Sequence, residues 1–478
     1  LPPVRMGDWS RTLNLGFDMG ALSGSPGSLQ WLWCSRLSVH RVSLMDRSRL
    51  NRIGHLALPL VGAMMSQTVL NLVDTAMVGF LGTDALAGVG TGSFVAFMAT
   101  ALVMGLSSGV LAMAARRVGE GRGNESAVPL TGGLVLALLV GLPLTIVLLA
   151  LSASIFPLIN STPGVVNAGL PYYDALLLSI TAVGMNFAFR GYWTGTSQSR
   201  VYMYVLLFIH VANAAISYTL IFGKFGMPEL GTRGAGLGTT IALFLGTAIH
   251  FVLAWKRARK NGFLRRIPRR ETMATMLQLA IPTAIQEFLF AAGFTAIFWI
   301  VGRMGTAETA GTNVLITMAL VAILPAVGLG LAALTLVSEA LGRNEPDEAY
   351  RWAWDVTKVA VVSLGLIGLP ALLVPDLILA GFIYDPDVIA MTRPSLRLMG
   401  GTMFIDGIGL VLLHALLGAG AAKQVMVVSV GSQWLVGLPL AWLVGPQLGL
   451  GLFSVWTTQA LYRTIQAAVF VELWRRRG

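Results

Sequence analysis

Two stretches of this chain have nearly the same sequence, and they lie 223 residues apart. The first contains LALP, which ends at Pro59, and VGFLGTDALAG, which ends at Gly88. The second contains LAIP, which ends at Pro282, and VGRMGTAETAG, which ends at Gly311. Repeated halves in a membrane protein usually meet at a functional interface. The repeat therefore predicts both an architecture and the place where a site should lie.

The composition indicates an integral membrane protein. The chain has 478 residues, of which 55% are hydrophobic and 12% are charged. Soluble proteins carry about 25% charged residues, so this chain has about half the usual number. It contains one cysteine, Cys34, and therefore no intramolecular disulfide.

The net charge of +11 reflects orientation in a membrane and not binding to nucleic acid. Most Lys and Arg residues fall in alternate segments between the predicted spans and near the two ends of the chain. This positive-inside pattern places both termini in the cytoplasm of a multi-pass protein, which we expect in the bacterial inner membrane. The densest basic run, from Lys256 to Arg270, is expected to be a cytoplasmic linker held against anionic lipid.

Residues 1–46 contain no apolar run long enough to cross a bilayer, and we expect a disordered cytoplasmic tail. Met45 lies just before the first predicted helix, which leaves open whether residues 1–44 belong to the native protein. A spanning helix needs about 20 apolar residues. Twelve segments meet this requirement, at 53–79, 86–115, 127–153, 168–193, 201–223, 234–255, 273–302, 309–338, 353–375, 392–418, 424–445 and 448–472.

These segments predict an all-α integral membrane protein with twelve transmembrane helices in two six-helix bundles. The first bundle covers residues 47–255 and the second covers residues 273–478, with the basic cytoplasmic linker 256–272 between them. Because six is even, both halves enter the membrane in the same direction. Their relation is then a pseudo-two-fold axis along the membrane normal, with a cavity expected between the bundles.

Several polar side chains lie inside the apolar spans, and each needs a reason to be there. Asp74 lies in the outer half of the first span. A partly buried carboxyl at that position can bind and release a proton near neutral pH, or it can make a structural hydrogen bond. Glu287 and Gln286 lie in the seventh span, where we expect ion coupling or substrate binding. The alternative for Glu287 is a carboxyl near the inner interface.

Two histidines accompany polar partners in other spans. Asp406 and His414 lie eight residues apart in the tenth span, which places them on nearly one helix face, about 12 Å apart. His210 lies three residues before Asn213 in the fifth span, also on one face. These four side chains are candidates for ion or substrate binding. For the histidines, hydrogen-bonded packing is the alternative.

Pro59 and Pro282 occupy matched positions near the start of the first and seventh spans. A proline inside a helix removes one backbone hydrogen bond and bends the helix, so both are candidate hinges. The alternative is that each proline simply begins a helix. Arg190, near the cytoplasmic end of the fourth span, is expected to reach the interface or to pair with an acid.

The motifs together resemble those of the multidrug and toxic compound extrusion (MATE) transporters. The first half contributes VDTAMVGFLG followed by GTDALAG, and the second contributes VGRMGTAETAGTNVL. The segment from Asp406 through HALLGAG, followed by Gln433-Trp434 and Leu438-Pro439-Leu440, also fits the family pattern. The resemblance covers residues 48–472.

The resemblance implies an antiporter that exports organic, often cationic, compounds in exchange for protons or sodium. It places the family's acid of the first helix at Asp74 and that of the tenth helix at Asp406. The family's glutamate of the seventh helix corresponds to Glu287, with a possible Na⁺ site near Glu287 and Asp406. A second acid found in one branch after Asn213 is Ser217 in this chain, so Asp74 would act alone in the first half.

The expected function is therefore secondary active efflux by alternating access, performed by a monomer without a cofactor. The sequence contains no P-loop, HExxH motif, paired cysteines or nucleophile arrangement, which argues against an ATP-driven pump and an enzyme. H⁺ is the preferred coupling ion because the acids are scattered through both halves and two histidines accompany them. The alternative function is a flippase for a lipid-linked precursor. Such a protein needs several cationic residues in its cavity, and Arg190 is nearly the only candidate in the sequence.

Overall fold

The computed structural model describes residues 46–477 and divides the chain into two units, 1–52 and 53–478. Of the first unit, the described part is the beginning of the first helix. Asp46 lies before that helix and accepts a hydrogen bond from the Ser48 hydroxyl, 2.7 Å long. This bond holds the pKa of Asp46 below its usual range. The predicted tail lies, apart from Asp46, outside the described residues.

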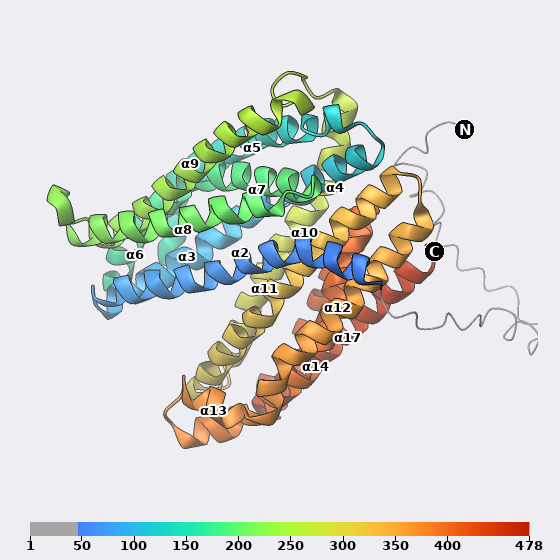
Figure 1. Cartoon of the computed structure of the whole chain (residues 1–478). Helices are drawn as coiled ribbons and strands as arrows, with labels where there is room; N and C mark the ends of the chain where they lie inside the picture. The colour runs from blue at the N-terminus through green and yellow to red at the C-terminus, as the bar shows by residue number, and fades with distance from the viewer. Residues whose placement is uncertain (1–45, 478) are drawn as a thin grey trace, which may run out of the picture. The chain divides into compact units, whose positions relative to one another are not determined.

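The first half of the chain forms a group of long helices joined by short turns. Figure 1 shows α8 and α9 packed beside α5 and α7, and the packing between these helices is extensive. The helices are α2 (Arg47–Gly79), α3 (Thr83–Met104), α4 (Leu106–Gly119), α5 (Val128–Ile159), α6 (Pro163–Leu177), α7 (Ile180–Gly195), α8 (Ser199–Phe222) and α9 (Gly231–Arg257), with 3₁₀ turns η2 (Gly123–Glu125), η3 (Lys224–Gly226) and η4 (Arg259–Asn261).

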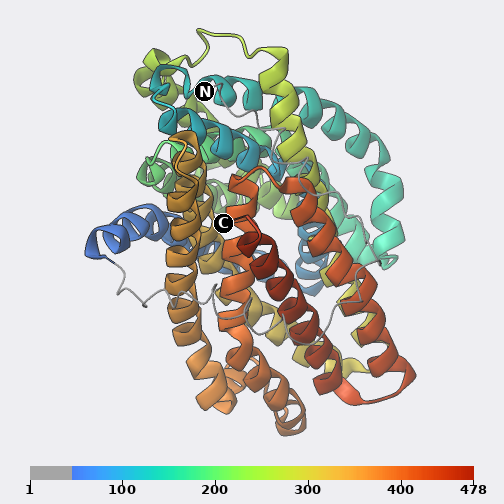
Figure 2. The same cartoon turned by 90° about the vertical axis from the view of Figure 1, so that its right-hand side faces the viewer.

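The second half repeats this pattern with more irregular ends. Figure 2 shows the orange α14 beside the dark red α17, and α14 also packs on α11 and α12. The elements are α10 (Arg270–Gly302), α11 (Thr306–Gly342), α12 (Pro346–Leu373), α13 (Pro375–Ala380), α14 (Pro386–Gly418), α15 (Ala422–Gly431), η5 (Ser432–Gly437), α16 (Leu438–Trp442), η6 (Leu443–Gln447) and α17 (Gly451–Arg475). Of these, η5 and η6 are π-helical.

Ten helical segments of the described chain are long and apolar enough to cross a membrane. The broken pair α6–α7 and the helix α17 complete twelve spans, as the sequence predicted. Large apolar side chains such as Leu139 and Ile146 are exposed on the outside of the helices, as expected for surfaces that face lipid. The prediction of an all-α membrane protein is confirmed.

The internal repeat is visible in the helix boundaries. Both α2 and α10 have 33 residues, and their first and last residues differ by the same offset of 223. The next helices, α3 and α11, begin at Thr83 and Thr306, again at that offset. The repeated sequence therefore folds into repeated structure, which supports the predicted relation between the two bundles.

Repeat-related glycines bring the two halves into close contact. A Cβ added to Gly119 at the end of α4 would overlap the carbonyl oxygen of Glu339 in α11. The symmetric contact joins Gly342 to the carbonyl oxygen of Arg116, because each residue differs from its counterpart by 223. Glycine at both positions lets two backbones approach at distances that any side chain would prevent.

A second pair of glycines acts in the same way closer to the prolines. Gly105, between α3 and α4, lies against the backbone of Ala280 and Ala284 in α10. Its repeat partner Gly328 lies against Val61 in α2. The second span of each half therefore packs on the first span of the other half.

Several features of the fold differ from the sequence prediction. The second span, expected as one helix over 86–115, is broken at Gly105 into α3 and α4. The eleventh, expected over 424–445, is divided into α15, η5, α16 and η6.

The fourth span, expected as one helix over 168–193, is broken after Leu177 into α6 and α7. The Thr145 hydroxyl donates a 3.2 Å hydrogen bond to the freed carbonyl of Leu177, and the Ser179 hydroxyl donates to Leu176. These bonds replace backbone pairing at the break. The short helix α13 between α12 and α14 was also not predicted.

The helices α2 and α10 continue through Pro59 and Pro282, so neither proline begins a helix. Each lies twelve residues after the helix start, among residues that face the other half. Whether the prolines act as hinges stays a prediction.

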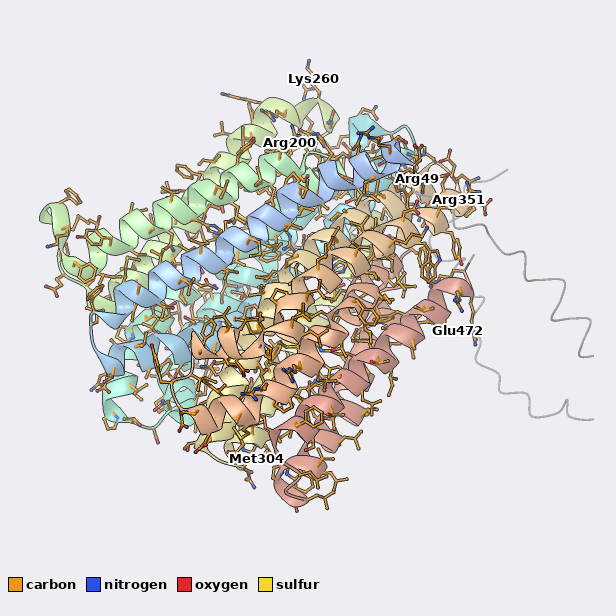
Figure 3. All side chains as sticks on the ribbon, turned by 60° about the horizontal axis from the view of Figure 1, so that its bottom comes forward. Arg49, Arg200, Lys260, Met304, Arg351 and Glu472 are labelled. Carbon is orange, nitrogen blue, oxygen red and sulfur yellow. The ribbon has the colours of Figure 1, made fainter. Side chains whose placement is uncertain are left out.

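The basic segment between α9 and α10 packs on the first half. Its Asn261 side chain donates to the Tyr192 hydroxyl, the backbone N–H of Leu264 donates to Thr131, and Arg266 forms an ion pair with Glu125. Figure 3 shows Lys260, Arg351 and Glu472 toward one end of the helices and Met304 toward the other. Lys260 and Arg351 thus lie toward the end that the charge pattern of the sequence assigns to the cytoplasm.

Candidate functional site

A cavity of about 250 Å³ lies between the two halves. The first half contributes residues of α2, α3, α4 and α7, and the second contributes residues of α10, α11, α14, α15, η5 and α17. Most of the lining is apolar and includes Met64, Phe97, Met104, Phe187 and Phe290. A cavity with an apolar wall and a few polar groups is the usual form of a small-molecule site.

Four of the predicted site residues meet in this cavity. Gln286 and Glu287 reach it from α10, and Asp406 and His414 reach it from α14. The Oε1 atom of Gln286 is buried and has no hydrogen-bond partner within the described residues. The two candidate acids of the second half therefore line the same space. The sequence could not establish this, because the acids belong to different helices and their spacing along the chain does not show how these helices pack.

Asp406 is held in an ion pair that was not predicted from the sequence. Arg463 of α17 donates from Nη1 to Oδ1 of Asp406 over 3.0 Å. The two side chains are 21% and 16% exposed, respectively, and both line the central cavity. The expectation that Arg190 is nearly the only cation in the cavity is wrong. An arginine inside the last predicted span was the available signal, because a charge in hydrocarbon needs a partner.

Arg190 is anchored by the first half and faces the second. Its Nε donates to the Ser107 hydroxyl over 3.0 Å, and its guanidinium lies 4.1 Å from the ring centre of Phe187. It also interacts electrostatically with Tyr202 of α8 and with Glu287 of α10, and Glu287 lines the same cavity. Arg190 therefore lines the same cavity as an acid, and direct pairing of the two side chains stays a prediction.

His414 and Gln433 complete the polar part of the wall. His414 Nδ1 lies 2.8 Å from the carbonyl oxygen of Leu410, one helical turn earlier. The ring packs on Gly330 of α11, where a Cβ would overlap it. Gln433 belongs to the π-helical segment η5, and its amide packs against Gly293 of α10. Such π-helical turns are frequent at functional sites, but no sequence pattern predicted this one.

Asp74 lies outside this cavity, in the first half. Its carboxyl interacts electrostatically with Tyr172 of α6, whose hydroxyl is 2.8 Å from the Ser93 hydroxyl of α3. One carboxylate oxygen of Asp74 is buried and has no hydrogen-bond partner in the described chain. The structure therefore separates the candidate acid of the first half from those of the second.

His210 and Asn213 also lie outside the cavity and hold helices of the first half together. The His210 ring nitrogens lie 2.9 Å from the Ser66 hydroxyl and 3.1 Å from Oε1 of Gln67, both on α2. The Gln67 amide donates to Asn71, which lies three residues before Asp74. A chain of hydrogen bonds thus runs from His210 of α8 through Gln67 to Asn71 of α2, in the direction of Asp74. Asn213 donates to Thr239 of α9 over 2.8 Å.

A second, smaller cavity of about 40 Å³ lies within the second half, and Asp406 and Arg463 belong to its wall as well. The pair therefore stands between the two cavities. No group of three or more His, Cys, Asp or Glu side chains is placed to hold a metal ion anywhere in residues 46–477.

Comparison with known proteins gives consistent matches. The family model described as MatE matches residues 59–219 and 282–443, which start at the two repeat-related prolines. A probable multidrug resistance protein NorM of Thermotoga maritima is 27% identical over 409 residues, covering 84% of this chain and 87% of that protein.

Two solved structures have a similar fold. An outward-facing multidrug resistance MATE family transporter of the MOP superfamily superposes with a TM-score of 0.83 at 19% identity, over 90% of this chain and 96% of that one. A MOP superfamily transporter from Pyrococcus furiosus gives a TM-score of 0.82 at 20% identity over the same shares, and it is described as having a binding pocket whose reversed polarity suggests a different function.

Proposed function

This chain belongs to the MatE family, and from that premise we propose that it is a secondary active multidrug exporter. Its substrates are amphipathic organic compounds that carry a positive charge, and they leave the cell in exchange for H⁺, with Na⁺ as the alternative. We place the protein in the bacterial inner membrane as a monomer, with both termini in the cytoplasm. The names of its relatives support multidrug export.

The observation that carries this proposal is the cavity between the halves. Its Phe and Met side chains offer an adaptable apolar surface, and Glu287 and Asp406 offer negative charge to a bound cation. A site of this kind accepts many compounds because shape and polarity are only loosely specified.

Alternating access follows from the repeat. The halves meet through Gly119 and Gly342 at the end that the basic residues assign to the cytoplasm. Rocking of the two bundles about their shared helices would open the cavity to one side at a time. Proton binding at Asp74, which does not line the cavity, favours the conformation from which the substrate is released outside.

The ion pair of Asp406 supports H⁺ over Na⁺ as the coupling ion. A sodium ion at Asp406 has to compete with a guanidinium already 3.0 Å away. A proton needs no coordination shell and can bind to Asp74, whose carboxylate is not paired with a cation in the described residues. Asp74 is therefore the proposed proton site.

Proteoliposomes containing the purified protein test this proposal. Efflux of a fluorescent organic cation is followed under an imposed pH gradient and then under a sodium gradient. We expect transport driven by the pH gradient alone. Transport that requires sodium would instead assign the coupling to Glu287 and Asp406, and no transport under either gradient would contradict the proposal.

A flippase for a lipid-linked precursor remains the second candidate because two arginines, Arg190 and Arg463, line the cavity. Arginines suit the phosphate groups of such lipids. Both, however, face acids of the same cavity, which lowers the positive charge available to a phosphate. Gradient-independent movement of a phosphate-bearing lipid between leaflets would favour this candidate.

A further inference from the structure

We propose that two clusters of charged residues with reversed signs form an electrostatic latch, which holds the two halves together at the cytoplasmic end and which salt weakens. One cluster lies at the end of α4 and the other at the end of α11. We call them the first triad, which is Arg116, Glu120 and Arg122, and the second triad, which is Glu339, Arg343 and Glu345. The inference rests on the alternating access of the proposed function, but not on its substrates or its coupling ion.

The two triads are related by the internal repeat, and every charge is reversed between them. At the offset of 223, Arg116 corresponds to Glu339, Glu120 to Arg343 and Arg122 to Glu345. The first triad therefore has one more base than acid, and the second has one more acid than base. The repeat has kept charged residues at these positions and has exchanged their signs.

The structure shows the same two ion pairs in both triads. Arg116 Nε lies 3.7 Å from Glu120 Oε1, and Arg122 Nη1 lies 3.0 Å from Glu120 Oε2. In the second triad, the Nη1 and Nε atoms of Arg343 each lie 2.7 Å from a carboxylate oxygen of the two flanking glutamates. The central residue thus bridges its two neighbours in each triad. Because these pairs lie within one half, they persist when the halves separate, and opening leaves none of these side chains without an opposite charge.

The triads lie on either side of the closest contact between the halves. A Cβ added to Gly119 would overlap the carbonyl oxygen of Glu339, and one added to Gly342 would overlap that of Arg116. The side chains of Arg116 and Glu339 are only 17% and 13% exposed. Near a two-fold axis, residues approach their own symmetry counterparts. Equal charges would therefore repel across this contact, whereas the reversed charges of the two triads attract.

This attraction is suited to a contact that opens and closes repeatedly. Partly exposed charges attract one another weakly, so the latch changes the ratio of closed to open molecules by about two- to fivefold and does not lock either state. The attraction depends on salt, because the Debye length falls from about 30 Å at 0.01 M to about 3 Å at 1 M ionic strength. The backbone contact at the two glycines does not depend on salt in this way, which allows the two contributions to be separated.

Distances between spin labels at Asn124 and Asn344 report the separation of the halves. They are measured by double electron–electron resonance on the full-length protein in detergent, in a Cys34→Ser background and without substrate. Potassium chloride is raised from about 0.01 M to about 1 M, so that neither H⁺ nor Na⁺ is varied. We expect the ratio of closed to open molecules to fall about two- to fivefold in the wild type.

Reversal of one triad should reverse this salt dependence. The first variant combines Arg116→Glu, Glu120→Arg and Arg122→Glu, which keeps the ion pairs within the triad but places like charges across the contact. It should be more open than the wild type at low salt and should close as salt is added. Reversal of the second triad as well, by Glu339→Arg, Arg343→Glu and Glu345→Arg, should restore the salt dependence of the wild type.

The matched control is Glu472→Arg with Arg476→Glu, which reverses an ion pair of 2.7 Å at the end of α17. It should behave as the wild type does. A distorted α4 would shift the distances at all salt concentrations in the same direction, whereas an opposite salt dependence reports the charges.

Distances in the wild type that do not change with salt would overturn the inference, and so would an unchanged salt dependence in the variant with one reversed triad. Absence of gradient-driven dye transport would contradict the proposed function instead. The distances need neither a gradient nor a substrate, so they would still decide whether the latch exists.

Discussion

At the scale of single residues, the polar side chains of the membrane interior fall into two sets with different surroundings. Glu287 and Asp406 face arginines in the cavity between the halves, whereas Asp74 lies in the first half beside Tyr172. We therefore propose that the acids of the second half hold the substrate and that Asp74 binds a proton at a distance from it. Their roles can be separated by single substitutions.

Asp74→Asn should abolish efflux driven by a pH gradient. The amide keeps the size of the side chain but cannot bind and release a proton. Dye binding in detergent should be retained, because Asp74 does not line the cavity. Efflux from proteoliposomes is the measurement, and Asp387→Asn, an exposed acid at the start of α14, is the control. Unchanged efflux by the Asp74 variant would remove this residue from the mechanism.

His250→Phe should reduce stability without affecting transport. The His250 Nδ1 atom accepts a 3.1 Å hydrogen bond from the Trp193 indole, and both side chains are fully buried. Removing the acceptor leaves a buried N–H group unpaired, at a cost of about 1–3 kcal/mol. Thermal unfolding in detergent measures the loss. The double variant with Trp193→Phe should recover part of it, and additive losses would show that the hydrogen bond is unimportant.

At the scale of helices, glycines and prolines at repeated positions define how the halves meet. Gly119 and Gly342 permit contact between α4 and α11, and Pro59 and Pro282 lie in the helices that pack across the halves. The repeat made these positions visible in the sequence. The close contact of the glycines was not predictable, because the sequence does not show whether a glycine in an apolar span faces lipid or another helix.

Gly342→Ala should favour separation of the halves at the cytoplasmic end. The added Cβ overlaps the carbonyl oxygen of Arg116, and such overpacking costs about 1–3 kcal/mol. The equilibrium should then shift about 5- to 150-fold toward the open state. The shift is measured as the distance between spin labels at Asn124 and Asn344, determined by double electron–electron resonance. Gly365→Ala, which has open space around it, should leave the distances unchanged. Equal distances in the two variants would show that the close contact at Gly342 does not hold the two halves together at this end.

Pro282→Ala should slow transport more than it weakens binding. Alanine restores a backbone hydrogen bond to Gln278 and stiffens α10, while the cavity lining stays the same. The turnover rate in proteoliposomes should therefore fall, while the dye affinity should stay close to that of the wild type. An unaltered turnover rate would show that this proline is not a hinge.

At the scale of the whole molecule, the sequence predicted the fold well and the site in part. The twelve spans follow from the lengths of the apolar segments, and the repeat follows from the constant offset of 223 residues. Both can be read directly from the sequence. The cavity was expected between the bundles, and Glu287, Gln286, Asp406 and His414 do line it. The pairing of Arg463 with Asp406 was missed because the two residues are 57 positions apart and meet only through the packing of α14 on α17.

The most direct test of the account asks whether the cavity between the halves is the place where substrate binds. In a Cys34→Ser background, Ser429→Cys places one thiol in the cavity wall. Its labelling by a membrane-impermeant maleimide is measured from each side of the membrane, with and without a transported dye. We expect labelling that the dye slows and that a pH gradient moves from one side of the membrane to the other. Labelling that neither the dye nor the gradient affects would contradict it.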